Sequence, residues 1–183
     1  MESRYQKVSR YFFLFMIVSF LGWLVETVFF FILYGDFYDR GFMTLPFCTI
    51  YGCALFMVDA LIGIPGKGSG VLLIWEQNRP WKVPVYVLLS AIIPVGLELV
   101  TGYFFDRILG LRLWDYSACR FHFRGYICLE YALLWSVLVP LCMRCVYAPL
   151  KKWVFGLNVS YTGIGSVVLG LCACFDWGNK FLV

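Results

Sequence analysis

The sequence predicts an all-α polytopic membrane protein, a bundle of about five transmembrane helices. Of its 183 residues, 62% are hydrophobic and only 14% are charged, whereas soluble domains average about 45–50% apolar and about 25% charged residues. The mean hydropathy is +0.80. The apolar residues also collect in runs of about 20 or more, the length that crosses a bilayer as a helix. A water-soluble fold of this size could not bury so much apolar surface, so we expect lipid to cover the excess.

Five apolar runs have the composition of membrane spans. Nothing in the sequence marks a second domain, so we predict a single transmembrane domain over residues 1–183. The first run follows a short basic head and lacks a small-residue cleavage site, which predicts a retained helix rather than a signal peptide. The last run is diluted by glycines and polar residues, and a soluble C-terminal hairpin remains the alternative there. The predicted spans cover residues 11–34, 45–64, 83–105, 125–148 and 153–175.

The distribution of lysine and arginine predicts a cell-membrane protein with a cytoplasmic N-terminus. In this orientation nine basic residues flank the inner ends of the spans and six flank the outer ends, and such an excess is typical of cytoplasmic loops. The net charge of +4 forms no single patch, which argues against a nucleic-acid partner. Four of the six outer basic residues fall in one loop, namely Arg107, Arg112, Arg120 and Arg124.

Acidic residues interrupt the apolar runs. The rise of a helix predicts that Glu26, Glu98 and Glu130 all lie in the outer half of the membrane. A lone ionised acid near a helix centre costs about 2.5–3.5 kcal/mol, so we expect these side chains to face the bundle interior or a water-filled cavity. Two interpretations remain open. The acids pair with arginines of the outer loop and pin the bundle, or they line a polar cavity, open outward, that binds a small solute or ion.

The chain carries no recognised ATP-binding, catalytic or metal motif. Near Gly66-Lys67 the pattern G-x-x-x-x-G-K-[ST] is incomplete, because position 62 is isoleucine and Gly68 follows the lysine. The patterns HExxH and GxSxG are absent as well. Cys142 and Cys145 have C-x-x-C spacing but lack the second pair of a zinc site, so we interpret the cysteines as packing residues. We therefore predict no catalytic residue, no metal site and no cofactor.

Several short segments occur in a characteristic order along the chain. They are Gly22-Trp23-Leu24-Val25-Glu26-Thr27, Arg40-Gly41-Phe42 followed by Ile50-Tyr51-Gly52, Gly96-Leu97-Glu98 with Thr101-Gly102, Trp114-Asp115-Tyr116-Ser117, and Gly125 followed by Ile127-Cys128-Leu129. Through these segments the chain resembles the CmpB-like family of small bacterial membrane proteins, described as "putative type IV ABC-transporter permeases". The resemblance implies a helical membrane fold and suggests transport. The family usually shows an asparagine and an arginine where this chain has His122 and Tyr126.

The charged residues that the resemblance matches belong to the outer-half group of acids and arginines. This coincidence makes the outer half of the membrane the predicted ligand-binding region or polar cavity. Its candidate residues are Glu26, Arg40, Tyr51, Glu98, Trp114, Asp115, Tyr116, Arg124 and Glu130.

These observations favour a membrane transport protein, or a permease-like subunit of one, that binds or moves a small or anionic solute. Because the chain has no ATP motif of its own, an ABC mechanism would need a separate cytoplasmic ATPase that docks on the basic inner loops. The first alternative is a membrane-embedded enzyme that acts on a lipid or cell-envelope precursor. The second is a non-transporting membrane partner or sensor.

Overall fold

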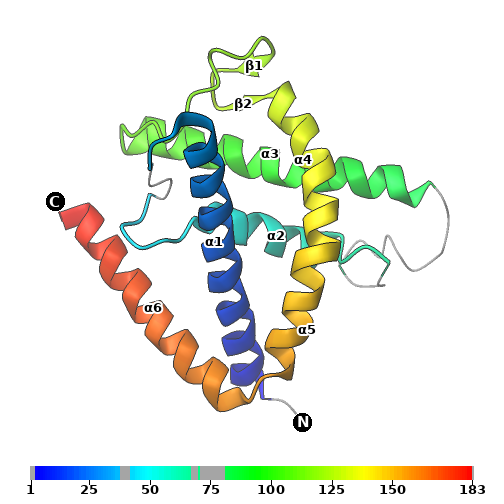
Figure 1. Cartoon of the computed structure of the whole chain (residues 1–183), viewed down its shortest axis with the longest axis vertical. Helices are drawn as coiled ribbons and strands as arrows, with labels where there is room; N and C mark the ends of the chain where they lie inside the picture. The colour runs from blue at the N-terminus through cyan, green and yellow to red at the C-terminus, as the bar shows by residue number, and fades with distance from the viewer. Residues whose placement is uncertain (1–2, 38–41, 67–69, 71–80, 183) are drawn as a thin grey trace. The chain divides into compact units, whose positions relative to one another are not determined.

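The protein is helical over most of its length, as the computed structural model shows for residues 3–37, 42–66, 70 and 81–182. Two short strands, β1 (His122–Phe123) and β2 (Ile127–Cys128), pair as an antiparallel hairpin. The helices are α1 (Arg4–Tyr34), α2 (Thr49–Leu61), α3 (Lys82–Ile108), α4 (Leu129–Cys142), the π-helical turn η1 (Met143–Tyr147), α5 (Ala148–Gly156) and α6 (Val159–Leu182), labelled in Figure 1.

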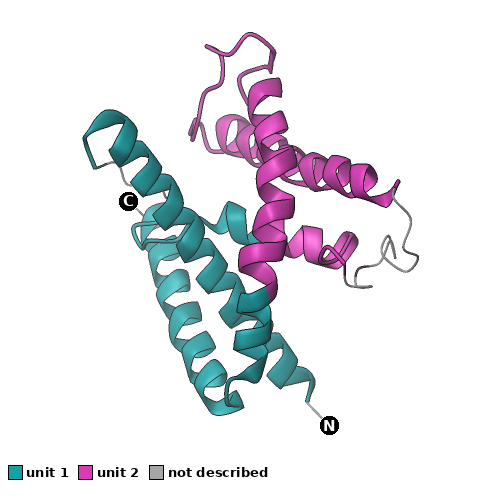
Figure 2. Cartoon of the chain, turned by 45° about the vertical axis from the view of Figure 1, so that its right-hand side comes forward, with its two compact units in different colours: residues 1–53, 149–183 teal, residues 54–148 magenta. Residues whose placement is uncertain are grey.

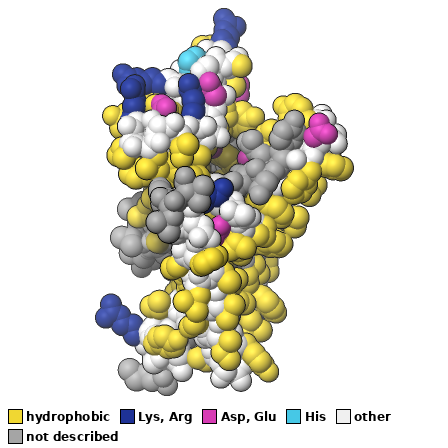
Figure 3. Space-filling view, turned by 90° about the vertical axis from the view of Figure 1, so that its left-hand side faces the viewer, with side chains coloured by type: hydrophobic (Ala, Val, Ile, Leu, Met, Phe, Trp, Pro, Cys, Tyr) yellow, Lys and Arg dark blue, Asp and Glu magenta, His cyan; other side chains and the backbone are white. Residues whose placement is uncertain are grey.

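Among the described residues, four helical segments are long and apolar enough to cross a membrane, which makes this a multi-pass membrane protein. They cover Arg4–Tyr34, Lys82–Ile108, Leu129–Gly156 and Val159–Lys180. Their apolar side chains lie largely on the surface, where Val25 is 68% exposed and Ile32 is 75% exposed. Hydrophobic side chains accordingly cover much of the face drawn in Figure 3. The predicted fold class, all-α and polytopic, is confirmed.

The second predicted span contains a helix of only 13 residues, α2. At 1.5 Å per residue it measures about 20 Å, less than the hydrocarbon thickness of about 30 Å. Pro46 explains the late start, because the residue before a proline is disfavoured in helical conformation. Gly63, with φ of +81°, ends the helix on the other side. The run 45–64 is therefore helical over only part of its length.

The boundary between the last two predicted spans also differs from the expectation. The fourth helix begins at Leu129 instead of residue 125, because Gly125 (φ +74°) occupies a turn of the hairpin. It then continues past residue 148 through η1 and α5. Pro149 lies just beyond η1. Proline has no amide hydrogen to donate along the helix, and the π-helical turn accommodates this missing hydrogen bond. The break falls at Asn158, whose side-chain oxygen accepts a hydrogen bond from the Ser160 amide and caps α6.

The chain divides into two compact units, one comprising residues 1–53 and 149–183 and the other residues 54–148 (Figure 2). In the first unit α1 packs against α6 through small side chains. The Ser166 hydroxyl donates to the Ser9 carbonyl over 2.7 Å, and a Cβ at Gly165 would lie 2.6 Å from the Phe13 ring. In the second unit α3 packs against α4 and β2. There the buried Tyr86 donates its hydroxyl to the Gly63 carbonyl.

Two glycines let α1 and the start of α2 approach closely in the first unit. A Cβ at Gly22 would lie 2.6 Å from the Cβ of Tyr51, and a Cβ at Gly52 would lie 2.7 Å from the Phe15 ring and against the Ser19 hydroxyl. The Cys48 amide donates to the Ser19 carbonyl beside this contact. Small residues at such a crossing replace side-chain bulk with direct backbone approach.

Substitution of either glycine should separate these helices. We expect Gly22→Ala and Gly52→Ala each to lower the free energy of unfolding by about 1–3 kcal/mol, the usual cost of overpacking. The matched control is Gly163→Ala, in α6 of the same unit, because a Cβ there meets no atom within 4 Å. Alanine is the better helix former, so the control should hold or raise stability. Thermal unfolding of the purified variants measures this, and equal melting temperatures for all three would contradict the close-packed crossing.

Candidate functional site

Glu26 lies on the part of α1 that packs against the start of α2. Its carboxylate accepts a hydrogen bond from the Tyr51 hydroxyl over 3.1 Å. The Cys48 sulfur lies 3.9 Å from the same carboxylate oxygen. The side chain is half-buried. The structure therefore brings together two of the predicted site residues, Glu26 and Tyr51.

Glu98 is the most enclosed of the predicted site residues. It lies within α3 and is only 8% exposed. The indole Nε1 of Trp135, on α4, donates to its carboxylate over 3.1 Å. The buried Pro94 lies one turn earlier and leaves a carbonyl of the preceding turn without its helical amide partner. Glu98 thus occupies a locally loosened stretch of an otherwise regular apolar helix.

A third acid, Asp59, repeats this arrangement, although it is not a predicted site residue. Asp59 of α2 is 8% exposed and accepts a hydrogen bond from the Tyr147 hydroxyl over 2.9 Å. Tyr147 is fully buried, and its ring meets that of Phe56 edge-on at a centroid distance of 5.8 Å. Glu26, Glu98 and Asp59 therefore each receive a hydrogen bond from an aromatic side chain of another helical element. Pairing with arginines is one of the two interpretations that the sequence leaves open, and neither Trp135 nor Tyr147 is a predicted partner.

The segment Trp114-Asp115-Tyr116-Ser117 builds a turn around Asp115. The Asp115 carboxylate accepts hydrogen bonds from the backbone amide and the hydroxyl of Ser117, and it forms an ion pair with Arg112 over 2.9 Å. These Ser117 hydrogen bonds, helped by the Arg112 charge, hold the pKa of the Asp115 carboxyl below its usual value. The carboxylate is therefore charged and already engaged at neutral pH.

Gly125 closes the loop against this turn. Its carbonyl accepts a hydrogen bond from the Tyr116 amide over 2.9 Å. Its φ of +74° lies in the left-handed region, and an added Cβ would overlap the Arg112 guanidinium and lie 2.7 Å from Asp115 Oδ1. The Gly125 amide donates to His122 Nδ1 over 3.1 Å, an acceptor role that an asparagine oxygen could also fill. Only glycine fits this position.

Trp114 and Tyr126 fasten the loop to the end of α3. The Trp114 indole donates to the Tyr126 carbonyl over 2.8 Å, and its ring lies against Gly102, where a Cβ would be 3.2 Å away. Tyr126 is 3% exposed. Its hydroxyl donates to the Asp106 carboxylate, and this bond raises the pKa of the Tyr126 hydroxyl. The loop is thus packed on the helix rather than free.

Tyr116, Arg124 and Glu130 have separate partners. The Tyr116 ring stacks on Tyr131 of α4 at a centroid distance of 4.7 Å. The exposed Arg124, with φ of +52°, lies over the Phe123 ring, 5.7 Å from its centroid. The Glu130 carboxylate lies within 4.8 Å of the Cys119 and Cys128 sulfur atoms. Within the described part of the chain Arg124 and Glu130 form no ion pair with each other.

The predicted site residues are distributed over both units. Glu26 and Tyr51 belong to the first unit, and Glu98 with the loop residues belongs to the second. Arg40 lies outside the described residues. The convergence of Glu26 with Glu98 and Glu130 in one cavity remains a prediction.

A hollow of about 420 Å³ lies in the second unit, beside the C-terminal half of α3. Its walls are mainly apolar, and Arg124 is the predicted site residue among them. It is lined by Leu99, Val100, Tyr103, Phe104, Ile108, Phe123, Arg124 and Tyr126.

The sequence of the chain matches one family model. The family is described as "Putative ABC-transporter type IV", and the match covers residues 13–180. The chain has no match among curated proteins and none among solved structures.

Gly125 and Gly110 provide a matched test of the loop. Both have positive φ, but a Cβ at Gly110 meets nothing within 4 Å, whereas one at Gly125 overlaps the Arg112–Asp115 turn. We expect Gly110→Ala to cost about 1 kcal/mol for its backbone conformation. Gly125→Ala should cost about 1–3 kcal/mol more because of the overlap. Thermal unfolding together with limited proteolysis of the loop measures the difference, and equal effects would show that the turn is not tightly packed.

Proposed function

Because the chain belongs to the family described as "Putative ABC-transporter type IV", we propose that it is a permease-like membrane subunit that binds or moves a small solute. The observation that carries the proposal is Glu98, a nearly buried acid inside a long apolar helix. Ionisable groups at membrane depth are costly, and they commonly mark solute or ion paths. A transporter-type family also fits a non-enzymatic protein.

The surroundings of Glu98 support a binding role. The Trp135 indole donates a hydrogen bond to one carboxylate oxygen and so fixes the position of the acid between α3 and α4. Pro94 leaves the Ser90 carbonyl without its helical amide partner, which loosens α3 on the N-terminal side of Glu98. A solute with a cationic or hydrogen-bond-donating group is therefore the expected ligand of Glu98, while the arginines of the outer loop would bind an anionic group.

A separate cytoplasmic ATPase would supply the energy. The chain itself lacks the phosphate-binding pattern. The basic residues near the predicted inner ends of the spans, among them Lys151 and Lys152, would form the docking surface. Lys151 lies over the Tyr11 ring, 5.3 Å from its centroid, so part of this surface is ordered by contacts within the first unit.

We further propose that the N-terminus is cytoplasmic and that residues 45–64 complete a crossing despite the short α2. The number of crossings before α3 decides which side carries the loop between α3 and α4. With five crossings, nine basic residues fall inside and six outside; with four, the numbers become eight and seven. The positive-inside bias is larger for five crossings.

Neutralising Glu98 should remove function without unfolding the protein. In Glu98→Gln the amide oxygen can still accept the Trp135 hydrogen bond, so the melting temperature should stay close to that of the wild type. We expect the solute difference between cells with and without the protein, measured by mass spectrometry, to fall about tenfold or more, a loss of at least about 1.4 kcal/mol in binding. Asp36→Asn, an exposed acid outside the predicted site, is the control and should behave as wild type. A folded Glu98→Gln variant with an unchanged solute profile would leave Glu98 with a packing role.

Cysteine labelling can count the crossings. In a variant without native cysteines, single cysteines at Asp36, Ala118 and Ser160 should be tested with an impermeant thiol reagent on intact cells. Asp36 reports the outer end of α1. With five crossings, Ala118 should also react and Ser160 should be protected. Protection of Ala118 together with labelling of Ser160 would show four crossings, and protection of Asp36 would invert the orientation.

A further inference from the structure

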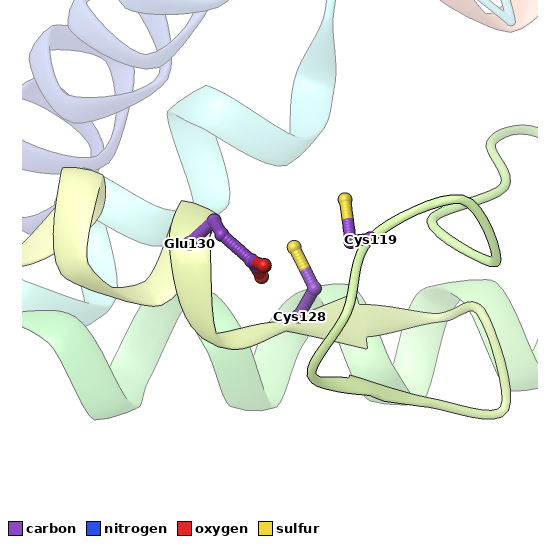
Figure 4. Close-up of side chains that lie close together, drawn as sticks. All are labelled: Cys119, Cys128 and Glu130. Carbon is purple, nitrogen blue, oxygen red and sulfur yellow. The ribbon is translucent and has the colours of Figure 1, made fainter.

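The hairpin between α3 and α4 brings two thiols and a carboxylate together. Cys119 lies in the turn before β1, Cys128 ends β2, and Glu130 lies in the first turn of α4. Their sulfur and carboxylate oxygen atoms all lie within 4.8 Å of one another. Figure 4 shows the three side chains close together, with the Glu130 carboxylate directed toward the Cys128 sulfur. No other group of three such ligand atoms is this compact among the described residues.

We propose that Cys119, Cys128 and Glu130 bind a thiophilic divalent cation of the Zn²⁺ class. Zinc binds thiolate sulfur at about 2.3 Å and carboxylate oxygen at about 2.0–2.2 Å in tetrahedral geometry. Ligand atoms around such an ion are therefore about 3.3–3.8 Å apart. The observed spacing requires only small side-chain rotations to reach this geometry. A water molecule would complete the fourth position.

The backbone around the group is already arranged to hold it. Glu130 lies in the first turn of α4, two residues after Cys128, so the hairpin and the helix start together place its carboxylate beside the thiols. The Cys119 amide donates to the Tyr116 carbonyl over 2.9 Å, and the Leu129 amide donates to the Phe121 carbonyl over 2.9 Å. Such outer contacts fix ligand orientation in metal sites.

Burial and charge are also compatible with a bound cation. Cys128 is 4% exposed and Cys119 is half-buried, so water competes weakly for the sulfur atoms. Two thiolates and one carboxylate carry three negative charges, one more than a divalent cation neutralises. Arg120, in the same turn, can offset the remaining charge. Figure 3 shows further cationic side chains near the histidine of this hairpin.

The carboxylate distinguishes this site from a simple pair of thiols. A disulfide between Cys119 and Cys128 would use both sulfur atoms and give Glu130 no ligand role. A metal ion would use all three groups, and it would clamp the hairpin to the first turn of α4. The C-x-x-C pair Cys142–Cys145, which the sequence makes the more obvious candidate, belongs to no such group of three.

Cobalt binding to the purified, reduced full-length protein tests the proposal. Co²⁺ is the probe because thiolate coordination gives it intense near-ultraviolet absorption, which Zn²⁺ should abolish by displacement. We expect one ion per chain, and we expect Zn²⁺ to raise the melting temperature. Cys119→Ser and Cys128→Ser should lose the absorption, and Glu130→Gln should weaken Co²⁺ affinity about tenfold or more. The double variant Cys142→Ser/Cys145→Ser is the matched control and should bind as wild type.

Three results would overturn the proposal. The first is cobalt absorption that persists in Cys119→Ser. The second is an unchanged Co²⁺ affinity in Glu130→Gln. Because the Glu130 side chain is exposed, this variant should fold even if a variant of the buried Cys128 does not. The third is reduced wild-type protein that shows no thiolate–cobalt absorption.

Discussion

An acid inside an apolar helix must receive hydrogen bonds, because the membrane interior supplies no water to solvate it. In this protein an aromatic side chain of a neighbouring helical element donates this hydrogen bond, as Trp135 does for Glu98. The indole or phenol buries its ring among apolar neighbours and presents a single donor, so no second charge has to be buried. Each such bond also fixes the position of one helix against another. The acid is thereby held in place.

The fold class could be predicted from the sequence because membrane crossing depends on the length and hydropathy of local runs. The limits of α2 could not be predicted, since Pro46 and Gly63 lie inside one continuous apolar run. The partner of Glu98 could not be predicted either. Trp135 lies 37 residues away, and which residues face each other depends on how α3 packs on α4. Charge complementarity favoured arginines, but a neutral donor is less costly to bury.

The resemblance segments divide into two groups once their contacts are known. Trp114, Asp115 and Gly125 hold the loop together, and their side chains or backbone conformations are largely occupied by that task. Tyr51 instead contacts Glu26 within the bundle. A sequence motif in this protein therefore reflects the residues that a loop needs for its packing at least as much as the residues of a binding site. The acids inside the helices are the more direct indication of function.

The π-helical turn η1 has a consequence for which face of its helix each residue occupies. A π turn carries one residue more than an α turn, and each α-helical residue advances the face by about 100°. The side chains of α5 are therefore rotated relative to the pattern that α4 would impose on them. Deleting one residue between Met143 and Tyr147 could restore a regular helix, yet it would turn the whole of α5 onto a different face. The register between α4 and α5 thus depends on a single extra residue. A local average of hydropathy would not reveal how this residue changes the faces on which the side chains of α5 lie.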